Sequence, residues 1–205
     1  GKTRDDVPGQ VDRVEFDMRQ RVQQRDAPGA GAEIAAARHL GRATQNILPP
    51  NYPSYQKLNL YPHNLAKAKQ LIQDAGAKGE KVTVWTRQVS DALDSAQYYT
   101  SVLNSIGLDA RLTTLPKSTY YTTIGNINTK AQTGWARWLE DYPHPLDWFD
   151  VLLNGENIVQ QDNNNFAYFN NKKINKEIDA LKKAPLLTAA INAKWKAVEK
   201  QVMQQ

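Results

Sequence analysis

Helix and strand signals alternate along the middle of the chain, and this alternation limits the fold more than any other feature of the sequence. Apolar residues at helical spacing over 64–76 precede an alternating, β-branched stretch at 81–86. A second helical pattern over 90–107, with Ser90 expected as its N-terminal cap, leads into a second strand pattern at 108–115. Helices that alternate with short strands are typical of an α/β domain. We therefore predict an α/β fold for this region.

Weaker signals complete the expected order of elements. A short helix over 117–125 and a third strand over 133–138 follow the second strand. Three prolines in the segment 41–61 fix φ and remove N–H donors, so we expect an extended connector there. Two amphipathic helices are predicted to close the chain. Their apolar residues recur at i, i+4 and i+7, namely Ile174, Ile178 and Leu181, and then Ile191, Trp195, Val198 and Val202.

Composition removes several classes of chemistry. The 205 residues include no cysteine, which excludes disulfides, thiolate nucleophiles and cysteine-bound metal. The three histidines lie far apart, and the sequence has neither a phosphate-binding glycine loop nor a nucleophile elbow. We therefore predict no cofactor and no metal site. Neither a membrane-spanning apolar stretch nor a signal-peptide pattern is present, so we expect a soluble chain whose export signal lies outside the given sequence.

The net charge of +5 is concentrated near the C-terminal end. Eight lysines between Lys172 and Lys200 face only three carboxylates in the same stretch. Lysines spread over two amphipathic helices usually form a solvated face, and we expect no nucleic-acid partner. A polyanion-binding surface on residues 172–200 is kept as an alternative function.

The most unusual stretch of the chain is 133–150, which holds three of the five tryptophans and four carboxylates. On a strand, Trp135 and Arg137 would point one way and Ala136 and Trp138 the other, so one face could contact a ligand. Tryptophan offers a rigid surface with an N–H donor, and a carboxylate can pair with an ammonium group. These residues suit a site for a peptide or another cationic or polar solute. Core and edge packing of the aromatic residues is the competing interpretation.

Two further constellations within this part of the chain are weaker candidates. Glu140 and Asp141 could act as a general acid and base in a carbohydrate hydrolase, although adjacent carboxylates diverge on an extended chain. Asn163 and Asn165 could offer oxygen ligands to calcium, but Asp162 is the only charge nearby, and a turn is the expected role.

Several linked motifs over residues 41–205 resemble the extracellular solute-binding proteins of family 5, the peptide and nickel type of ABC importer. ILPPNYPSY resembles the family's connector, and YPHNLAKAKQLIQDAG is similar to its "Y...KAK.LL.EAG" helix. TGWARWLEDYPHPLDWFD matches the "W..DYPDP" segment, with His144 where an aspartate is common, and NNNFAYFNNKKINKEIDAL resembles "N...Y.N..vD.Ll". The residues in these motifs are most similar to those of the family's actinobacterial branch.

This resemblance implies a lobe of a periplasmic-binding-protein-like fold (type II, Venus-flytrap) within an incomplete two-lobed architecture. VPGQVDRVEFDM resembles a family strand that lies much farther upstream, so residues 1–44 are expected to be the remnant of the preceding lobe and hinge. Residues 45–205 are then expected to form the C-terminal α/β lobe.

The resemblance also implies a function without catalysis. We expect a monomeric substrate-binding component of an ABC importer, which binds a small solute, most simply a peptide, and delivers it to a membrane permease. Its location is expected to be extracytoplasmic, with a lipid anchor in the full-length protein. The family pattern assigns Trp135, Ala136 and Arg137 to ligand contacts, Asp141 to the peptide ammonium, and Trp138 and Tyr142 to the wall of the site.

Overall fold

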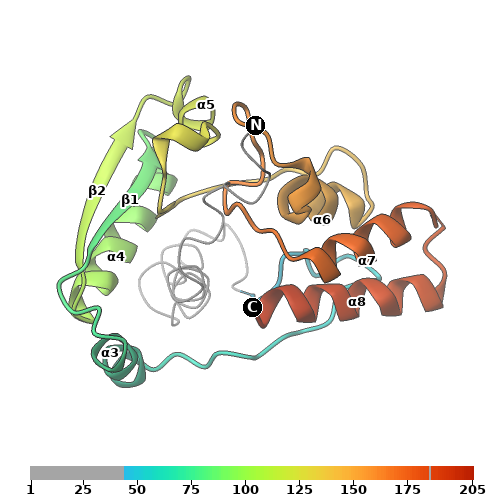
Figure 1. The fold of residues 1–205 in the computed structure, drawn as a ribbon, viewed down its shortest axis with the longest axis horizontal. Helices are drawn as coiled ribbons and strands as arrows, with labels where there is room; N and C mark the ends of the chain where they lie inside the picture. Colours follow the sequence, from blue (N-terminus) through green and yellow to red (C-terminus); the bar gives the residue numbers. More distant parts are fainter. Residues whose placement is uncertain (1–43, 185) are drawn as a thin grey trace, which may run out of the picture.

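The computed structural model describes residues 44–184 and 186–205. In this part of the chain a three-stranded parallel sheet has the order β2-β1-β3. β1 (Lys81–Arg87) pairs with β2 (Asp109–Leu115) along its whole length. Parallel strands need a crossover connection, and the helical segment between β1 and β2 supplies it (Figure 1). The α/β fold predicted from the alternating pattern is confirmed.

Residues at the ends of the helices beside the sheet determine where these helices begin and end. α3 (Leu65–Asp74) starts at Asn64, whose side chain accepts a hydrogen bond from the Lys67 N–H, and the chain leaves it through Gly76 at a φ of 65°. α4 (Ser90–Ser105) is the crossover helix and packs against both β1 and β2.

Ser90 was predicted as the N-terminal cap of this crossover helix, and that prediction is wrong by one residue. Val89 occupies the cap position with extended dihedrals, and its carbonyl accepts the Leu93 N–H at 2.8 Å. Ser90 is therefore already the first helical residue, because the chain turns into the helix one peptide earlier than the serine signal indicates.

The third strand is also shorter than predicted. β3 comprises only Thr133–Gly134, which pair with Val84 and Trp85 of β1, instead of the expected 133–138. The Trp135 N–H still donates to the Trp85 carbonyl at 2.9 Å, and beyond this point the chain leaves the sheet. Side chains, described below, satisfy the backbone groups that a longer strand would have paired.

The second half of the molecule is helical. It contains α6 (Leu146–Leu153), α7 (Lys172–Lys182) and α8 (Ala189–Met203), so the two predicted C-terminal helices are confirmed. α7 and α8 lie side by side and run in opposite directions (Figure 1). Their core centres on Trp195, whose ring stacks on Phe149 at a centroid distance of 5.5 Å.

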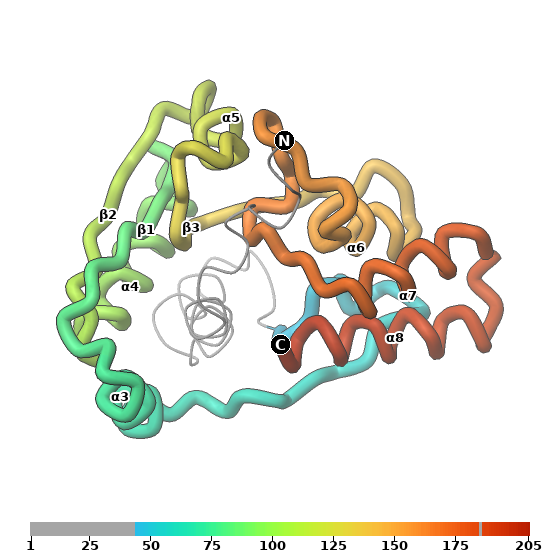
Figure 2. The backbone as a smooth tube through the Cα atoms, in the orientation of Figure 1, coloured from blue at the N-terminus to red at the C-terminus, as the bar shows by residue number. Residues whose placement is uncertain are grey.

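Three short elements complete the described chain. α5 (Tyr120–Ile124) follows β2, and single turns of 3-10 helix are formed by η2 (Ile127–Thr129) and η3 (Gly155–Asn157). The two halves have separate hydrophobic cores. Figure 2 shows the chain passing between them twice, once before α3 and once between β3 and α6.

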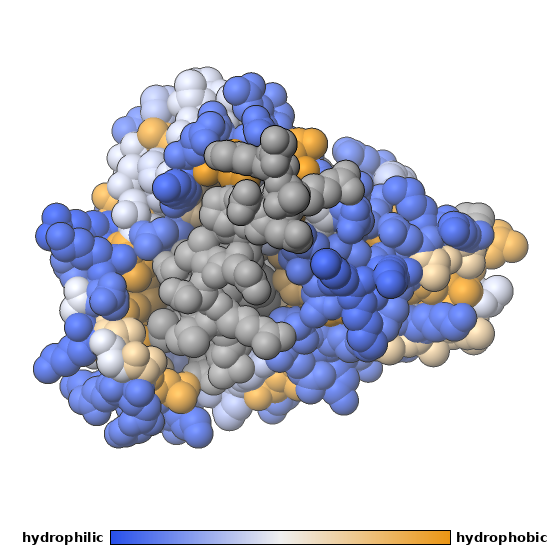
Figure 3. Space-filling model, viewed as in Figure 1, coloured by the Kyte–Doolittle hydropathy of each residue, from blue (hydrophilic) through white to orange (hydrophobic). Residues whose placement is uncertain are grey.

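The lysine-rich stretch forms the outer faces of α7 and α8. Figure 3 shows predominantly hydrophilic side chains over this part of the surface. Lys173 lies 3.1 Å from Glu177, and Lys182 lies 2.6 Å from Asp150. The expected solvated face is therefore present, and within the described residues no helix is long and apolar enough to cross a membrane.

A buried carboxylate fastens the connector to α8. Glu199 is fully buried and accepts hydrogen bonds from the N–H groups of Ile47 and Leu48 at 2.9 and 2.8 Å. Its second oxygen accepts from the Asn46 side chain at 2.9 Å. Burial raises the pKa of Glu199 above its ordinary value, although the three donors act in the opposite direction.

Glu199→Leu is expected to lower the free energy of unfolding by about 2–5 kcal/mol, because it leaves three donors without their acceptor. Glu199→Gln retains one carbonyl oxygen and should lose only about 1 kcal/mol. Denaturant unfolding of both variants measures the difference, with Glu80→Gln, at an exposed residue just before β1, as the control. Equal, small effects of both Glu199 variants would show that the contact contributes little.

The raised pKa of Glu199 also predicts a pH dependence of stability. The folded chain holds this proton to a higher pH than the unfolded chain does, so the stabilisation is complete below about pH 4.3, the ordinary glutamate value. That stabilisation is lost as pH rises through the raised pKa. The stability of the native protein relative to Glu199→Gln should therefore fall across this window in unfolding curves, and a constant difference would contradict the assignment.

Candidate functional site

A cavity of about 500 Å³ lies between the sheet half and the helical half. Its walls come from β1, α4, α5, α6 and the segments 131–138 and 164–167. Residues from both hydrophobic cores reach it, including Val84 and Tyr99 on one side and Trp148 and Leu152 on the other. Its volume falls within the range of roughly 300–1,000 Å³ that is common for small-molecule sites.

Four of the six residues that the sequence singled out line this cavity. They are the consecutive residues Trp135, Ala136, Arg137 and Trp138. Asp141 and Tyr142 do not line it, and both side chains are exposed to solvent. The segment after β3 therefore brings the aromatic residues to the site but carries the two expected polar partners past it.

The start of this segment approaches β1 so closely that only glycine fits. A Cβ atom on Gly134 would lie 2.1 Å from the Trp85 carbonyl oxygen. Next to this contact, the Tyr120 hydroxyl donates to the carbonyl oxygens of Trp85 at 2.9 Å and Trp135 at 2.6 Å. Tyr120 is fully buried, and burial raises its pKa, so the group remains a neutral donor.

A second tyrosine hydroxyl holds the next turn of the segment. Tyr121 Oη accepts the Arg137 N–H at 3.2 Å and donates to the Arg137 carbonyl at 3.3 Å. Its ring also packs against that of Phe166, with centroids 5.7 Å apart. These side-chain contacts explain the short third strand, because they satisfy backbone groups that a neighbouring strand would otherwise serve.

Sequence reasoning missed one residue that shapes the site. Asp147, in the first turn of α6, has an exposed fraction of only 1%. Its Oδ2 accepts the indole N–H of Trp138 at 2.8 Å and the backbone N–H of Asp141 at 3.2 Å. Asp147 therefore fixes the tryptophan that forms part of the cavity wall. Its sequence position offers no signal for this, because an acidic residue in a first helical turn is common for electrostatic reasons alone.

Glu140, considered above as a catalytic acid, is instead hydrogen-bonded to the hydroxyl of Tyr52 in the connector. Trp148 Nε1 donates to the same hydroxyl at 3.0 Å. Burial raises the pKa of Tyr52 to about 12, with the hydrogen bond to Glu140 as the next contribution. The contact joins the connector to the loop that follows the cavity wall.

Two buried donors beside the cavity lack an acceptor among the described residues. They are Trp85 Nε1 and Arg87 Nε, both on β1. The Arg87 guanidinium carbon lies 4.2 Å from the centroid of the Trp135 ring, a cation–π contact.

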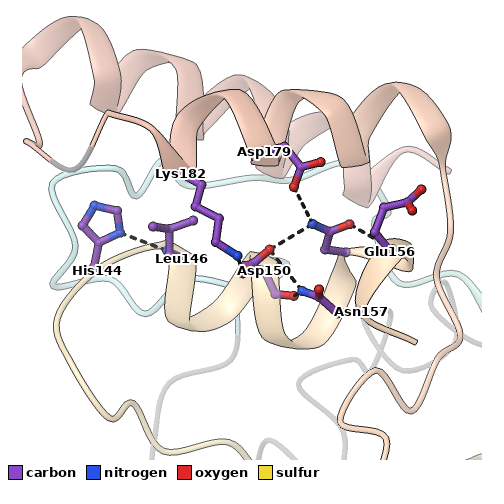
Figure 4. A network of polar contacts seen from close by, with 8 residues as sticks. His144, Leu146, Asp150, Glu156, Asn157, Asp179 and Lys182 are labelled. Atoms are coloured by element: carbon purple, nitrogen blue, oxygen red, sulfur yellow. Dashed lines mark hydrogen bonds and ion pairs between the residues drawn. The ribbon is translucent and has the colours of Figure 1, made fainter. Parts of the chain in front are cut away.

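A polar network ties α6, which carries Asp147, to α7 (Figure 4). Asp150 accepts from Lys182 at 2.6 Å and from Asn154 at 2.9 Å, and Asn154 also donates to Asp179 at 3.0 Å. Burial acts to raise the pKa of Asp150, but the hydrogen bonds from Lys182 and Asn154 lower it overall. The network stabilises the helix from which the site's buried carboxylate projects.

The asparagine cluster forms a turn, as expected. Asn163 donates to the Asn165 carbonyl at 2.7 Å, and the Asn165 side chain exchanges hydrogen bonds with the backbone of Phe169. Across the described residues, no group of three or more His, Cys, Asp or Glu side chains is arranged to hold a metal ion.

With this geometry in place, the comparisons with known proteins give the family. The model of the bacterial extracellular solute-binding proteins, family 5 (middle region), matches residues 34–160, which is more than half of the chain. The chain belongs to this family. No protein in the curated sequences matches it.

Solved structures share the fold of this solute-binding protein at low sequence identity. The DppA periplasmic binding protein of Helicobacter pylori, in complex with the peptide STSA, has a TM-score of 0.77 at 18% identity over 94% of this chain and 38% of its own. AgaA from A. tumefaciens, in complex with agropinic acid, has a TM-score of 0.76 at 23% identity, covering 92% of this chain and 38% of its own. The murein tripeptide binding protein MppA of Escherichia coli has a TM-score of 0.70 at 20% identity, covering 95% and 39%. The chain thus spans between a third and two fifths of the length of these relatives.

The predicted periplasmic-binding-protein fold and the family resemblance are both confirmed by these matches. The family is one of extracellular solute-binding proteins. The assignment of individual residues to ligand contacts stays a prediction.

Tyr120→Phe is expected to lower the free energy of unfolding by about 1–2 kcal/mol, because one hydroxyl serves two backbone carbonyls at the start of the cavity wall. Urea unfolding measures the loss. Tyr55→Phe, at a partly buried tyrosine of the connector, is the matched control and should change stability by less than about 0.5 kcal/mol. A similar loss in both variants would argue against the proposed contact.

Proposed function

We propose that this chain is the solute-binding part of an ABC importer's substrate-binding component, and that its cavity takes a peptide or a similar small polar solute. The observation that carries the proposal is the aromatic wall formed by Trp135 and Trp138, which line the same cavity within a segment fixed to the sheet at Gly134. Rigid aromatic walls with a few fixed polar groups are characteristic of small-molecule sites.

The ligands of related structures support this choice of solute. The Helicobacter pylori protein holds a peptide, and a dipeptide-binding protein from Pseudoalteromonas holds Met-Leu. AgaA holds agropinic acid, so a solute other than a peptide belongs to the same fold. A peptide remains our first proposal because two of these related structures hold peptides.

The proposed roles follow the family pattern, adjusted for the observed cavity. Trp135, Ala136 and Arg137 contact the solute, and Trp138 forms the wall. Asp141 and Tyr142 lie on the exposed side of the same loop, where they would meet only the part of a solute that extends beyond the cavity.

The rest of the proposal concerns the complete protein. Residues 45–205 form one lobe, residues 1–44 are the remnant of the preceding lobe, and closure of two lobes around the solute supplies affinity. The protein acts as a monomer outside the cytoplasm, held by a lipid anchor, and presents its solute to a membrane permease.

Isothermal titration calorimetry of the complete protein against short peptides tests the proposal. We expect saturable, reversible binding, and Trp135→Ala and Trp138→Ala should each weaken it by about tenfold or more, since each removes a large aromatic contact. Val159→Ala, at an exposed apolar residue outside the cavity, should leave affinity unchanged.

Two outcomes would favour the alternatives. Cleavage of a carbohydrate that stops in Glu140→Gln or Asp141→Asn would indicate a hydrolase. Binding of a polyanion that weakens steeply with salt and depends on the lysines of residues 172–200 would indicate a polyanion-binding module. Either result, without peptide binding, would overturn the proposed function.

A further inference from the structure

β2 lies at the outer edge of the sheet, because the order β2-β1-β3 gives it a neighbour on one side only (Figure 1). Its two end residues bond toward that neighbour. The Asp109 N–H donates to the Glu80 carbonyl at 2.9 Å, just before β1. The Leu115 carbonyl accepts the Gln88 N–H at 2.9 Å, just after β1. Backbone groups of successive strand residues point in opposite directions, so every second residue of β2 points away from the sheet. These outward residues are Ala110, Leu112 and Thr114.

The side-chain amide of Asn104 occupies the first of these outward positions. Asn104 lies in the last turn of α4, and its Oδ1 accepts the Ala110 N–H at 2.7 Å. Its Nδ2 donates to the Ala110 carbonyl at 3.1 Å. One amide thus satisfies both backbone groups of one residue, as the backbone of a neighbouring strand would. Because Asn104 is exposed to solvent, this contact lies at the surface of the sheet's edge.

Pro116 limits the same edge at its other end. It directly follows β2 and holds the next outward position, where a proline has no N–H to donate. Its carbonyl is used within the chain, because it accepts the Thr119 and Tyr120 N–H groups at 3.2 and 3.1 Å. Within the described part of the chain, only Leu112 and Thr114 of β2 therefore keep outward backbone groups without a partner.

The outward groups of β2 match those of a second copy of the same strand. Two β2 strands related by a two-fold axis would run antiparallel, with Leu112 opposite Leu112 and with Ala110 opposite Thr114 on either side of it. Two of these three pairs contain Ala110, whose backbone groups are already bound to Asn104. The one remaining pair is shorter than the strands of about three residues or more that sheets normally use.

We propose that Asn104 blocks the edge of β2 and thereby prevents two copies of this chain from joining their sheets. An unpaired strand edge is a template for association with another chain, and natural sheets cover or interrupt such edges. Here one exposed amide of the crossover helix interrupts the edge. The inference concerns self-association, and it does not depend on which solute the cavity binds.

A simpler role for the same contact is to fasten the end of α4 to the start of β2, six residues farther along the chain. The two roles lead to different results. A local fastening changes only the stability of each copy. A blocked edge changes an association that depends on protein concentration and on the outward groups of β2.

Asn104→Ala in the complete protein tests the inference by sedimentation equilibrium. The unsubstituted protein should be monomeric, and the variant should associate with a constant at least about tenfold larger, because two further residue pairs can form. Gln97→Ala, which shortens another exposed side chain of α4, is the matched control and should remain monomeric. If Asn104→Ala stays monomeric at every concentration, or if the unsubstituted protein already associates to the same degree, the inference is wrong.

A second substitution determines whether the association uses β2. Thr114→Pro removes an outward N–H at an exposed edge position, where proline is tolerated because no bond to β1 is lost. It interrupts the same two pairs that Asn104 interrupts. The variant that combines both substitutions should therefore be monomeric again. Association that persists in it would belong to another surface and would contradict the proposal.

Amide hydrogen exchange on the unsubstituted protein gives a measurement that does not depend on the folding of any variant. The Ala110 N–H should exchange at least about tenfold more slowly than those of Leu112 and Thr114, because Asn104 accepts it. In Asn104→Ala, all three amides should become protected together as the concentration rises. Equally fast exchange at the three positions of the unsubstituted protein would show that the edge is not blocked and would overturn the inference.

Discussion

The close parallel contact between Gly134 and Trp85 is the constraint on which the cavity depends. Because a Cβ atom at residue 134 would collide with the Trp85 carbonyl, only glycine allows β3 to reach β1 at this point. The following residues then leave the sheet with their backbone groups held by Tyr120 and Tyr121. A longer strand would have placed Trp135 and Trp138 on opposite faces of the sheet. The short one sends Trp135, Ala136, Arg137 and Trp138 across the space between the two cores, where all four contact the cavity.

The helical half is held against this segment by contacts from both sides. Asp147 binds Trp138 from α6, and the network around Asp150 fastens α6 to α7. Glu199 joins α8 to the connector, whose Tyr52 returns to the same loop through Glu140. Gln201 of α8 also donates to Glu177 of α7 at 2.7 Å, so polar contacts link the connector, α8, α7, α6 and the cavity wall in turn. Asp147, Asp150 and Glu199 each accept hydrogen bonds from neutral or charged donors, which is the condition for keeping such groups at low exposure.

The elements with local signals could be predicted from sequence, and those set by distant side chains could not. The signals for α3, β1 and β2 are local. Each element is set by its own apolar periodicity, and the ends of α3 are set by the adjacent residues Asn64 and Gly76. The length of the third strand depends on Tyr120 and Tyr121, which come from a different element. The same limit applies to the site. Trp135 and Trp138 were visible as an unusual cluster, whereas Asp147 is identifiable only once α6 is known to face Trp138. Asp141 and Tyr142 lie outside the cavity because the chain bends at Pro143 before α6, with the His144 N–H bonded to the Tyr142 carbonyl.

Four of the five tryptophans, at 85, 135, 138 and 148, line one cavity, and the fifth, Trp195, is sealed in the helical core. Most of the protein's tryptophan fluorescence therefore comes from residues at the cavity, while Trp195 contributes a constant background. Because the emission maximum of indole depends on the polarity around it, the entry or exit of water at the cavity shifts the wavelength of this maximum. The chain thereby carries its own optical reporter of occupancy, with no added label.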